Sequence, residues 1–266
     1  YGVFDFIGRP FKTSIVRKRV QNMINIYVYK NHLEQQVQEQ TAVLRKAYEK
    51  LEKQKERVEK LNKDILDMLG TIVEFRNLES GEHIMRVKGY TKILAEKFKE
   101  LYPEYNLTDE MIDNIVEASA LHDLGKISIP DKILLKPGRL TKEEFEYMKL
   151  HTVKGCELIQ AVNLEQSEEL KQICYDIIRY HHERYDGKGY PDGLKGDEIP
   201  VSAQLVSLAD VYDALINERC YKDAFSNEKA FNMIMNGECG TFSPKLLETF
   251  KQVRDKFERF AIEERK

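Results

Sequence analysis

The sequence has no tryptophan, no C-x-x-C pair and no apolar run of the roughly 20 residues that a helix needs to cross a bilayer. Its four cysteines are scattered, so a zinc ribbon or a disulfide framework is not expected, and reduced thiols in a cytoplasm fit better. No signal peptide is visible, because the opening YGVFDFIGRP lacks both a basic segment and an apolar core. Because the initiator methionine is missing, we expect a fragment of a longer protein. Because no long apolar run is present, we expect no membrane partner.

An excess of positive charge is also absent. Charged residues make up 33% of the chain, yet the formal net charge is only -3. This balance gives no reason to expect a nucleic-acid polymer as a partner. Together with a mean hydropathy of -0.54, it predicts a soluble, helix-rich protein with long exposed faces.

Neither glycine nor proline interrupts residues 11–69, as a continuous helix requires. Apolar residues recur every seven positions in this stretch, at Val37, Leu44, Leu51, Val58 and Ile65. A second series falls three places after the first positions of the same heptads, at Leu33, Ala47, Leu61 and Met68, with Gln40 and Gln54 as polar members. The pattern predicts a parallel coiled-coil homodimer over residues 29–68; a single surface helix is the alternative.

The rest of the chain, residues 69–266, shows helical periodicity and no alternating strand pattern. Helix starts are indicated by Thr108, by Thr141 with Glu144 three residues later, and by Ser243 before Pro244. We therefore predict an all-α domain large enough to bury its own core.

Five of the six histidines fall in this domain, whereas His32 lies in the predicted coiled coil, where a solvated side chain is expected. Glu79 and His83 are four residues apart, so on a helix they share one face. His122 and Asp123 end an apolar helical stretch and point about 100° apart, which suits two metal ions with the carboxylate between them. An incidental surface pair and a capped helix end are the structural alternatives.

The segment HHERYDGKGYP repeats this adjacency, because His181 and His182 end another apolar helix. Two imidazoles angled apart suit a cluster of two or three ions. The following residues cannot continue the helix, since Gly187 and Gly189 permit positive φ and Pro191 imposes a turn. We expect this loop to form a wall of the site.

Three further residues complete the set. By itself, His151 would be an ordinary core or boundary histidine. Asp210 and Asp213 share one face of an apolar helix, where buried acids need a partner such as a metal ion. The gathering of histidines and acids at helix ends and on apolar faces favours a metal centre over separate structural explanations.

In this order the residues resemble the HD-GYP family of HD-domain phosphohydrolases. The matching motifs are ESGEHIMR, HDLGK, HTVKG, HHERYDGKGYP, and LADVYDAL followed by RCYK, over roughly residues 70–240. The resemblance implies an HD-type helical bundle over residues 69–266 and a bacterial phosphodiesterase that opens cyclic di-GMP to pGpG and often continues to GMP. Cys220 departs from the family, which usually has proline there.

The resemblance also implies the site residues. Two or three divalent ions would be held by His83, His122, Asp123, His151, His181, His182 and Asp210, with Glu79 as the acid found in three-metal members. Phosphate contacts would come from Lys126, Arg219 and Lys222, and the substrate would lie beside Gly189, Tyr190 and Pro191. A set of imidazoles and carboxylates without thiolate favours iron or manganese.

We expect in-line attack of a hydroxide, formed between the ions, on a phosphodiester phosphorus, with the 3′-oxygen leaving. Lys126 would protonate the leaving oxygen or stabilise its charge, Asp123 would bridge the ions, and Asp213 would orient a neighbour rather than bind metal. Tyr190 either packs on a guanine base or serves only the turn. Two other functions stay open: a non-catalytic module that binds cyclic di-GMP or docks a partner, and hydrolysis of another cyclic dinucleotide.

The first 28 residues resemble the last strand and final helix of a response-regulator receiver domain. The stretch VFDFIGRPF is strand-like and ends in a turn, with Arg9 in place of the usual lysine, and a helical pattern begins at about Thr13. The phospho-acceptor aspartate of such a domain is absent from this chain. We therefore expect a receiver or sensor domain upstream and assign no receiver function to residues 1–28.

Overall fold

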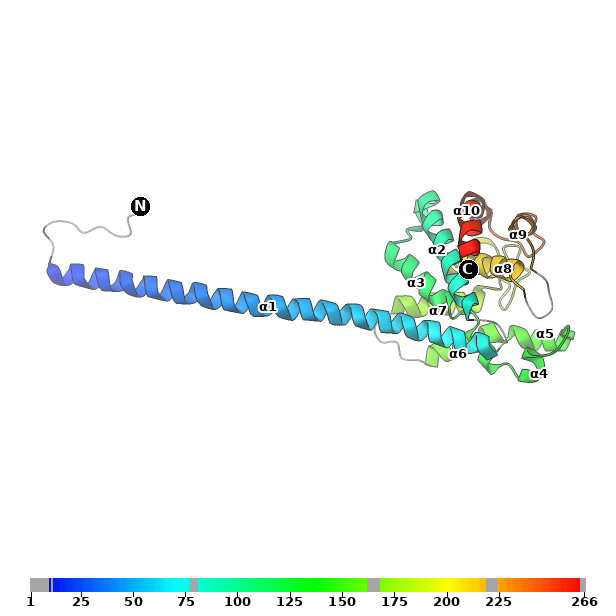
Figure 1. Ribbon diagram of the computed structural model, residues 1–266, viewed down its shortest axis with the longest axis horizontal. Coiled ribbons are helices and arrows are strands. Elements are labelled where there is room, and N and C mark those ends of the chain that lie inside the picture. Colours follow the sequence, from blue (N-terminus) through cyan, green and yellow to red (C-terminus); the bar gives the residue numbers. More distant parts are fainter. Residues whose placement is uncertain (1–9, 11, 77–80, 162–167, 219–223, 264–266) are drawn as a thin grey trace. The chain divides into compact units, whose positions relative to one another are not determined.

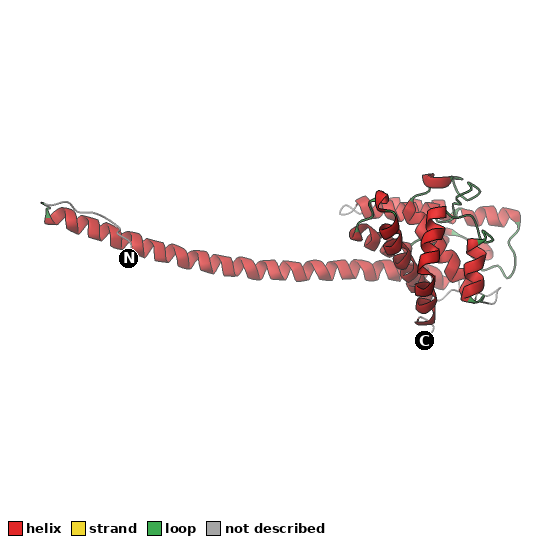
Figure 2. Ribbon diagram, turned by 90° about the horizontal axis from the view of Figure 1, so that it is seen from above, coloured by secondary structure: helices red, strands yellow, loops and turns green. Residues whose placement is uncertain are grey.

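The computed structural model describes residues 10, 12–76, 81–161, 168–218 and 224–263. Apart from one isolated β-bridge between Asp186 and Lys195, the regular structure in these ranges is helical, so the all-α prediction is confirmed (Figures 1 and 2). The chain divides into two compact units, residues 1–61 and 62–266. The strand predicted in VFDFIGRPF lies outside the described residues, and the domain limits at residues 28 and 68 stay predictions.

The first unit contains most of one long helix, α1 (Thr13–Arg76), which starts where the sequence predicts. The heptad side chains lie on its surface: Val37 is 53% exposed, Leu44 71% and Leu51 63%. His32 is exposed, as expected. Across the described residues, no helix has both the length and the apolar character of a membrane span. A continuous helix is therefore present, and its apolar row faces outward within this single chain.

The second unit packs shorter helices around α2 (Glu82–Leu101), which contacts α3, α8 and α10 (Figure 1). The other helices are α3 (Asp109–Ser119), α4 (Asp131–Leu134), α5 (Lys142–Lys149), α6 (His151–Ala161), α7 (Glu168–Tyr180), α8 (Val201–Ile216), α9 (Asn227–Met235) and α10 (Pro244–Glu263). Short 3-10 helices, η1 (Pro103–Tyr105), η2 (Leu124–Ser128) and η3 (Gly196–Glu198), lie in the connections.

An aromatic cluster joins the central helices. Tyr90 of α2 lies with its ring centroid 5.1 Å from that of Tyr212 on α8 and 4.7 Å from that of Phe257 on α10. Phe250 of α10 completes the cluster, and all four side chains are buried. Each such pair contributes about 0.5–1.5 kcal/mol beyond its area burial. This packing sets the position of α2 against α8, the two helices that carry His83 and Asp210.

The helix starts follow the sequence closely. The Thr108 hydroxyl accepts a hydrogen bond from the Met111 N–H at 3.1 Å, and Thr141 and Glu144 form a reciprocal capping box. The Ser243 hydroxyl accepts from the Leu246 N–H at 3.1 Å. These caps satisfy N–H groups that the first helical turn leaves without partners, so the predicted starts are confirmed.

Candidate metal centre

The predicted ligands come from five helices or the turns directly after them. His83 is the second residue of α2, His151 the first of α6, and Asp210 lies within α8. The pairs His122–Asp123 and His181–His182 follow α3 and α7. These ligands thus lie at the start of α2 and α6, within α8 and in the turns after α3 and α7, elements that belong to the same helical unit (Figure 1).

Two glycines allow the helices to approach closely enough for this convergence. A Cβ atom on Gly125 of η2 would overlap the carbonyl oxygen of His151 and lie 2.6 Å from the amide nitrogen of Gly155 on α6. A Cβ atom on Gly155 would in turn lie 2.5 Å from a methyl group of Ile178 on α7. The glycines in HDLGK and HTVKG thus let the backbones of η2 and α6 meet, which brings Asp123 beside His151.

The ligand atoms fall into two neighbouring groups. Within each group, one ligand atom per residue lies within 4.8 Å of the others: Asp123, His151, His181 and His182 form the first group, and Glu74, His83 and His122 form the second. The Asp123 carboxylate stands between them. Its Oδ1 is 3.3 Å from His151 Nε2, and its Oδ2 is 3.3 Å from His122 Nε2. This arrangement suits two adjacent cations with one shared carboxylate.

Asp210 extends the second group. Its Oδ1 lies 3.6 Å from His83 Nε2 and 3.9 Å from His122 Nε2. Both distances exceed those of a hydrogen bond but suit two atoms that face the same cation. Asp210 therefore lies where the sequence motifs predict a ligand.

The tautomers of four histidines follow from their backbone contacts. The Nδ1 atom of His122 lies 2.8 Å from the Ser119 carbonyl, that of His151 lies 2.8 Å from the Met148 carbonyl, and that of His181 lies 2.9 Å from the Ile177 carbonyl. A carbonyl oxygen only accepts, so each Nδ1 carries the proton and each Nε2 keeps a lone pair. For His83 the Asp213 carboxylate is the acceptor, 2.7 Å from Nδ1. Such contacts orient metal-binding imidazoles in proteins.

Among the described residues, the Nε2 atoms of these four histidines and the Asp123 Oδ1 are buried without a hydrogen-bond partner. Leaving buried polar atoms unsatisfied costs about 1–3 kcal/mol each. Five such atoms aimed at one another from separate elements are poor packing unless a cation binds them. The residues present therefore fit a divalent metal centre with nitrogen and oxygen ligands.

The electrostatics of the two groups differ. In the first, burial is the main reason that the pKa of His181 is lowered to about 3, and it lowers the pKa of His182 and His151 as well. In the second, burial alone would lower the pKa of His122, but the charges of Asp123 and Asp210 outweigh it and raise the pKa to about 10. The acids thus favour positive charge in the second group.

Asp213 acts on the centre through His83. Its carboxylate accepts hydrogen bonds from Arg86, with Nε at 2.7 Å and a terminal nitrogen at 3.2 Å, while it also contacts His83 Nδ1. Asp213 and Arg86 are both buried. The guanidinium fixes the carboxylate, and the carboxylate fixes the imidazole, which is the orienting contact that the sequence predicts for Asp213.

Tyr190 lies at the edge of the first group. Its amide donates to the His182 carbonyl at 3.3 Å, and the two rings are 4.7 Å apart. Glu183 anchors the loop, because its Oε1 accepts hydrogen bonds from the backbone amides of Asp192 at 2.7 Å and Gly193 at 2.9 Å. The loop is therefore a wall of the site, as predicted.

The glycines of this loop serve different purposes. Gly187 has a φ of +78°, in the region that favours glycine, whereas Gly189 is not among the residues with positive φ. A Cβ atom on Gly189 would instead overlap the backbone of Glu183 and Arg184. Gly189 therefore does not use the positive φ that a glycine permits; its missing side chain lets the loop fold back onto the chain that follows α7.

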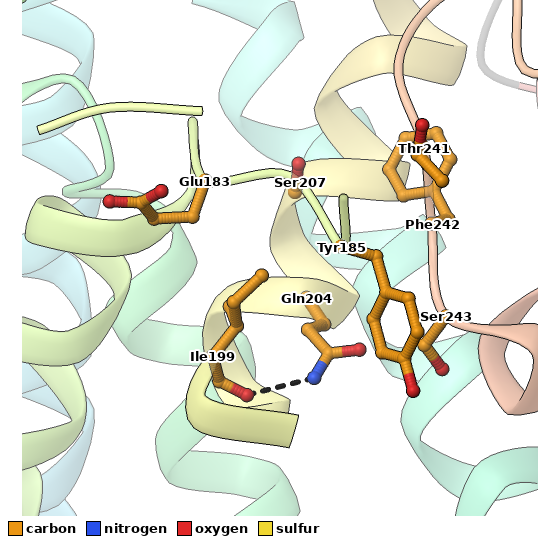
Figure 3. A pocket seen from close by; sticks show the side chains of 8 residues that line it. All are labelled: Glu183, Tyr185, Ile199, Gln204, Ser207, Thr241, Phe242 and Ser243. Carbon is orange, nitrogen blue, oxygen red and sulfur yellow. Dashed lines mark hydrogen bonds between the residues drawn. The ribbon is translucent and has the colours of Figure 1, made fainter. Parts of the chain in front are cut away.

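A pocket of about 180 Å³ opens beside the centre. It is lined by His181, His182, Tyr190, Arg184, Phe145 and Cys239 together with residues 240–242 and parts of α8. A smaller neighbouring pocket of about 10 Å³, shown in Figure 3, shares Glu183 and Thr241 with it but has room for no more than about one water. In Figure 3, the Gln204 amide bonds to the Ile199 carbonyl at 2.8 Å beside this smaller space. Of these two pockets, the larger is the one lined by predicted ligands, His181 and His182.

The helical arrangement, the His–Asp pair and the surrounding histidines agree with a family match over residues 81–246 to the HD domain. The chain belongs to the HD domain family. The predicted membership of the HD-GYP branch is also confirmed, because the sequences of curated cyclic di-GMP phosphodiesterases match nearly the whole of this chain. The match covers the elements that supply every described ligand of the two groups except Glu74.

The sequence of this HD domain protein is similar to those of two curated relatives, and its fold is similar to that of one solved structure. A probable cyclic di-GMP phosphodiesterase of Vibrio cholerae is 36% identical over 99% of this chain and 60% of its own length. A cyclic di-GMP phosphodiesterase of Thermotoga maritima is 34% identical over 97% of this chain and 68% of its own length. The chain thus spans about 60% of the first of these relatives.

The crystal structure of a cyclic GMP-AMP specific phosphodiesterase of V. cholerae shares the fold. It is 16% identical, with a TM-score of 0.53 over 77% of this chain and 51% of that one. At this identity the likeness extends to the helical architecture alone. It supports the HD-type bundle that the sequence motifs predict.

The structure brings together most of the predicted site residues of the HD domain. His83, His122, Asp123, His151, His181, His182 and Asp210 converge, and Lys126 Nζ lies 2.5 Å from Asp123 Oδ2. Three predicted residues lie outside the described part of the chain: Glu79, Arg219 and Lys222. Cys220, the departure from the family pattern, lies outside it too.

Sequence reasoning missed three residues near the centre. Glu74 belongs to the second group, Arg86 fixes Asp213, and Arg76 donates to the carbonyls of Lys126 at 2.8 Å and Ile129 at 2.7 Å. A signal was present for Glu74, because it stands alone among the apolar residues of GTIVEF. The rule applied to Asp210, that an acid in an apolar run needs a partner, applies equally there.

Proposed function

We propose that this protein is a metal-dependent phosphodiesterase that hydrolyses cyclic di-GMP to pGpG and onward to GMP in the bacterial cytoplasm. The observation that carries the proposal is the convergence of the Asp123 carboxylate with four buried imidazole nitrogens that have no hydrogen-bond partner among the described residues. The names of the relatives supply the substrate class. A purely structural role would leave these buried atoms without a reason.

We assign iron or manganese to the centre, because its donors are imidazole nitrogens and carboxylate oxygens without thiolate. The first cation would be held by Asp123, His151, His181 and His182, and the second by Asp123, His83, His122 and Asp210. When bound, the cations lower the pKa of water and withdraw charge from the phosphate. The low pKa of His181 and His182 keeps these imidazoles neutral and available as ligands at neutral pH.

The remaining roles belong to the chain's own residues. Lys126, held at Asp123, is positioned to stabilise the negative charge that develops on the leaving 3′-oxygen. Arg86 and Asp213 keep His83 in one orientation and act through it. Arg219 and Lys222 are proposed to hold the second phosphate, as their motif RCYK suggests.

The pocket beside the centre is proposed to take one nucleoside of the substrate. It combines the rings of Tyr190 and Phe145, whose centroids are 6.3 Å apart, with the exposed guanidinium of Arg184. Aromatic faces stack on bases, and a guanidinium suits the two acceptors on the major-groove edge of guanine. We therefore assign Tyr190 to base packing rather than to the turn alone.

Alkylation of Cys239 is expected to report whether the nucleotide enters this pocket. Burial raises the pKa of Cys156 to about 11 and that of Cys174 to about 12, so at pH 8 at most roughly one in a thousand of these thiols is ionised. Cys239 is half-buried and lines the pocket. Iodoacetamide should therefore label Cys239 before the other two, and a phosphorothioate analogue of cyclic di-GMP should slow this labelling several-fold.

Peptide mapping separates the Cys239 signal from that of Cys220 and of the two buried thiols. The labelling rate of Cys239 with ATP added in place of the analogue serves as the control. An unchanged rate at saturating analogue would place the nucleotide elsewhere.

Turnover by the metal-loaded chain tests the function itself. Protein prepared anaerobically with iron or manganese should convert cyclic di-GMP to pGpG and then to GMP. Chromatography of the reaction mixture measures both products. Binding of cyclic di-GMP without product by fully loaded protein would instead establish a non-catalytic binding module. Faster hydrolysis of the mixed 3′3′-cyclic GMP-AMP would assign the alternative substrate, which only a panel of cyclic dinucleotides distinguishes.

We propose that two copies pair along the heptad row of α1. The row is more than half exposed at Val37, Leu44 and Leu51, and burying it in a dimer seam would remove this apolar surface from water. Residues 1–28 resemble the end of a receiver domain, so an upstream receiver or sensor is the proposed source of the signal. Gln40 and Gln54 would keep the seam weak enough to change register.

A further inference from the structure

Glu74 occupies an unusual position at the end of α1. It is the third residue from the C-terminal end of the helix, and its side chain is fully buried, as is that of its neighbour Val73. The nearby Gly70 lies so close to the chain after α3 that a Cβ atom would overlap the Ala120 carbonyl oxygen. The last turns of α1 are therefore packed directly against the turn that carries His122.

The carboxylate of Glu74 faces the second ligand group. One of its oxygens and one nitrogen each of His83 and His122 lie within 4.8 Å of one another. The Nε2 atoms of both histidines are buried without a hydrogen-bond partner among the described residues, and their Nδ1 atoms are engaged by Asp213 and by the Ser119 carbonyl. The lone pairs of both imidazoles are thus left for a ligand in this space.

Asp210 faces the same space from the opposite helix. Its Oδ1 lies 3.6 Å and 3.9 Å from the two Nε2 atoms. Two imidazole nitrogens and carboxylates from two helices together form a donor set typical of manganese, iron or zinc.

We propose that Glu74 is a ligand of the second cation and that the last turns of α1 therefore form part of the metal centre. This inference rests on the proposed metal-dependent function, and it adds an acid that the motif ESGEHIMR does not contain. Glu79, the acid expected from that motif, lies outside the described residues, so the experiment compares both positions.

The test is a calorimetric titration of the metal-free full-length chain with Mn²⁺. Elemental analysis of the loaded protein then measures the bound metal. Wild type is expected to bind at least two Mn²⁺ per chain. Glu74→Gln should bind one fewer, or bind the weaker Mn²⁺ with roughly 10–100-fold lower affinity, the loss typical when a group that supports a metal site is removed. Glu96→Gln, an exposed glutamate on α2 that only approaches Lys92 at 4.0 Å, is the matched control and should behave as wild type.

A second readout follows the helix itself. Mn²⁺ should slow hydrogen exchange in peptides covering residues 66–76 of wild type, and this effect should be lost in Glu74→Gln. If Glu74→Gln does not fold, Glu74→Asp keeps the charge but shortens the reach by one methylene, and it should fold yet show the same weakened Mn²⁺ binding. Unchanged Mn²⁺ stoichiometry and affinity in the folded variant would overturn the inference, as would loss of the second ion in Glu79→Gln but not in Glu74→Gln.

The result is independent of turnover, because no nucleotide is present. A chain that binds its second Mn²⁺ through Glu74 but leaves cyclic di-GMP intact would refute the proposed function and leave this inference standing. A chain that hydrolyses cyclic di-GMP with an unaltered metal titration in Glu74→Gln would do the reverse.

Discussion

Replacement of Asp123 with asparagine is expected to lower cyclic di-GMP turnover at least roughly 10³-fold. Asp123 is the acid that faces both ligand groups, 3.3 Å from His151 Nε2 and 3.3 Å from His122 Nε2. The amide would place an N–H where a cation needs an oxygen lone pair and would remove a negative charge shared by two cations. Metal ions supply several kcal/mol of transition-state stabilisation, and about 4 kcal/mol corresponds to roughly 10³-fold in rate.

The measurement is kcat for cyclic di-GMP together with the metal content of the purified variant, which should fall as well. Asp113→Asn is the matched control, because Asp113 is an exposed aspartate on α3, the helix that leads into His122. It should retain wild-type turnover and metal content. If Asp123→Asn turned over at the wild-type rate, the shared-ligand assignment would be wrong.

Replacement of Gly125 with alanine is expected to destabilise the second unit by about 3 kcal/mol, the upper part of the usual range for overpacking. The new methyl group would overlap the His151 carbonyl oxygen and lie 2.7 Å from its carbonyl carbon, so two backbone segments would have to separate. In a unit of this size, each kcal/mol lowers Tm by roughly 2–4 °C, which gives a decrease of roughly 6–12 °C. Any folded fraction should also bind Mn²⁺ more weakly, because Asp123 directly precedes η2 and His151 begins α6, on either side of the contact.

Gly89→Ala provides a glycine control away from the centre. Its Cβ atom would meet only the ring of Phe260, a half-buried side chain near the end of α10 that can rotate away. The decrease in Tm should therefore be clearly smaller than for Gly125→Ala, with unchanged Mn²⁺ binding. Equal melting temperatures for Gly125→Ala and wild type would show that the close backbone contact does not exist in solution.

Features that depend on neighbours in the sequence were predictable. The long helix follows from the absence of glycine and proline and from the heptad pattern, and it begins at Thr13 as expected. The caps at Thr108, Thr141 and Ser243 follow from hydroxyls placed at helix starts. In each case the interacting groups are within four residues, so the local sequence contains all the atoms that matter.

The candidate metal ligands were predictable for a different reason. Burying histidines and acids is costly, so their placement at helix ends and on apolar faces already indicates a shared purpose. Their motif order then matches the HD domain family, and the structure brings together every predicted ligand within its described part. Composition and spacing thereby indicate which side chains are donors, but they do not give the arrangement of these side chains in space.

Contacts between distant segments were not predictable in the same way. The contacts of Asp213 with Arg86 and His83 join residues that are 127 and 130 positions apart, and Gly125 approaches His151 across 26 positions. The division of the ligands into two groups likewise depends on how separate helices pack. Gly189 shows the same limit, because a glycine in a turn motif is compatible with either a positive φ or a close backbone approach. Which applies depends on the chain that packs against it.

The sequence by itself determined a helical chain, a long heptad helix and most of the candidate metal-binding side chains, because periodicity, capping and the cost of burying polar groups act locally or through composition. Only the tertiary structure decided which oxygen faces which imidazole, and it placed Glu74 of α1 among them. The physical reason is that the position of a ligand around a cation depends on how separate helices pack, and packing is settled by contacts that no single stretch of sequence contains.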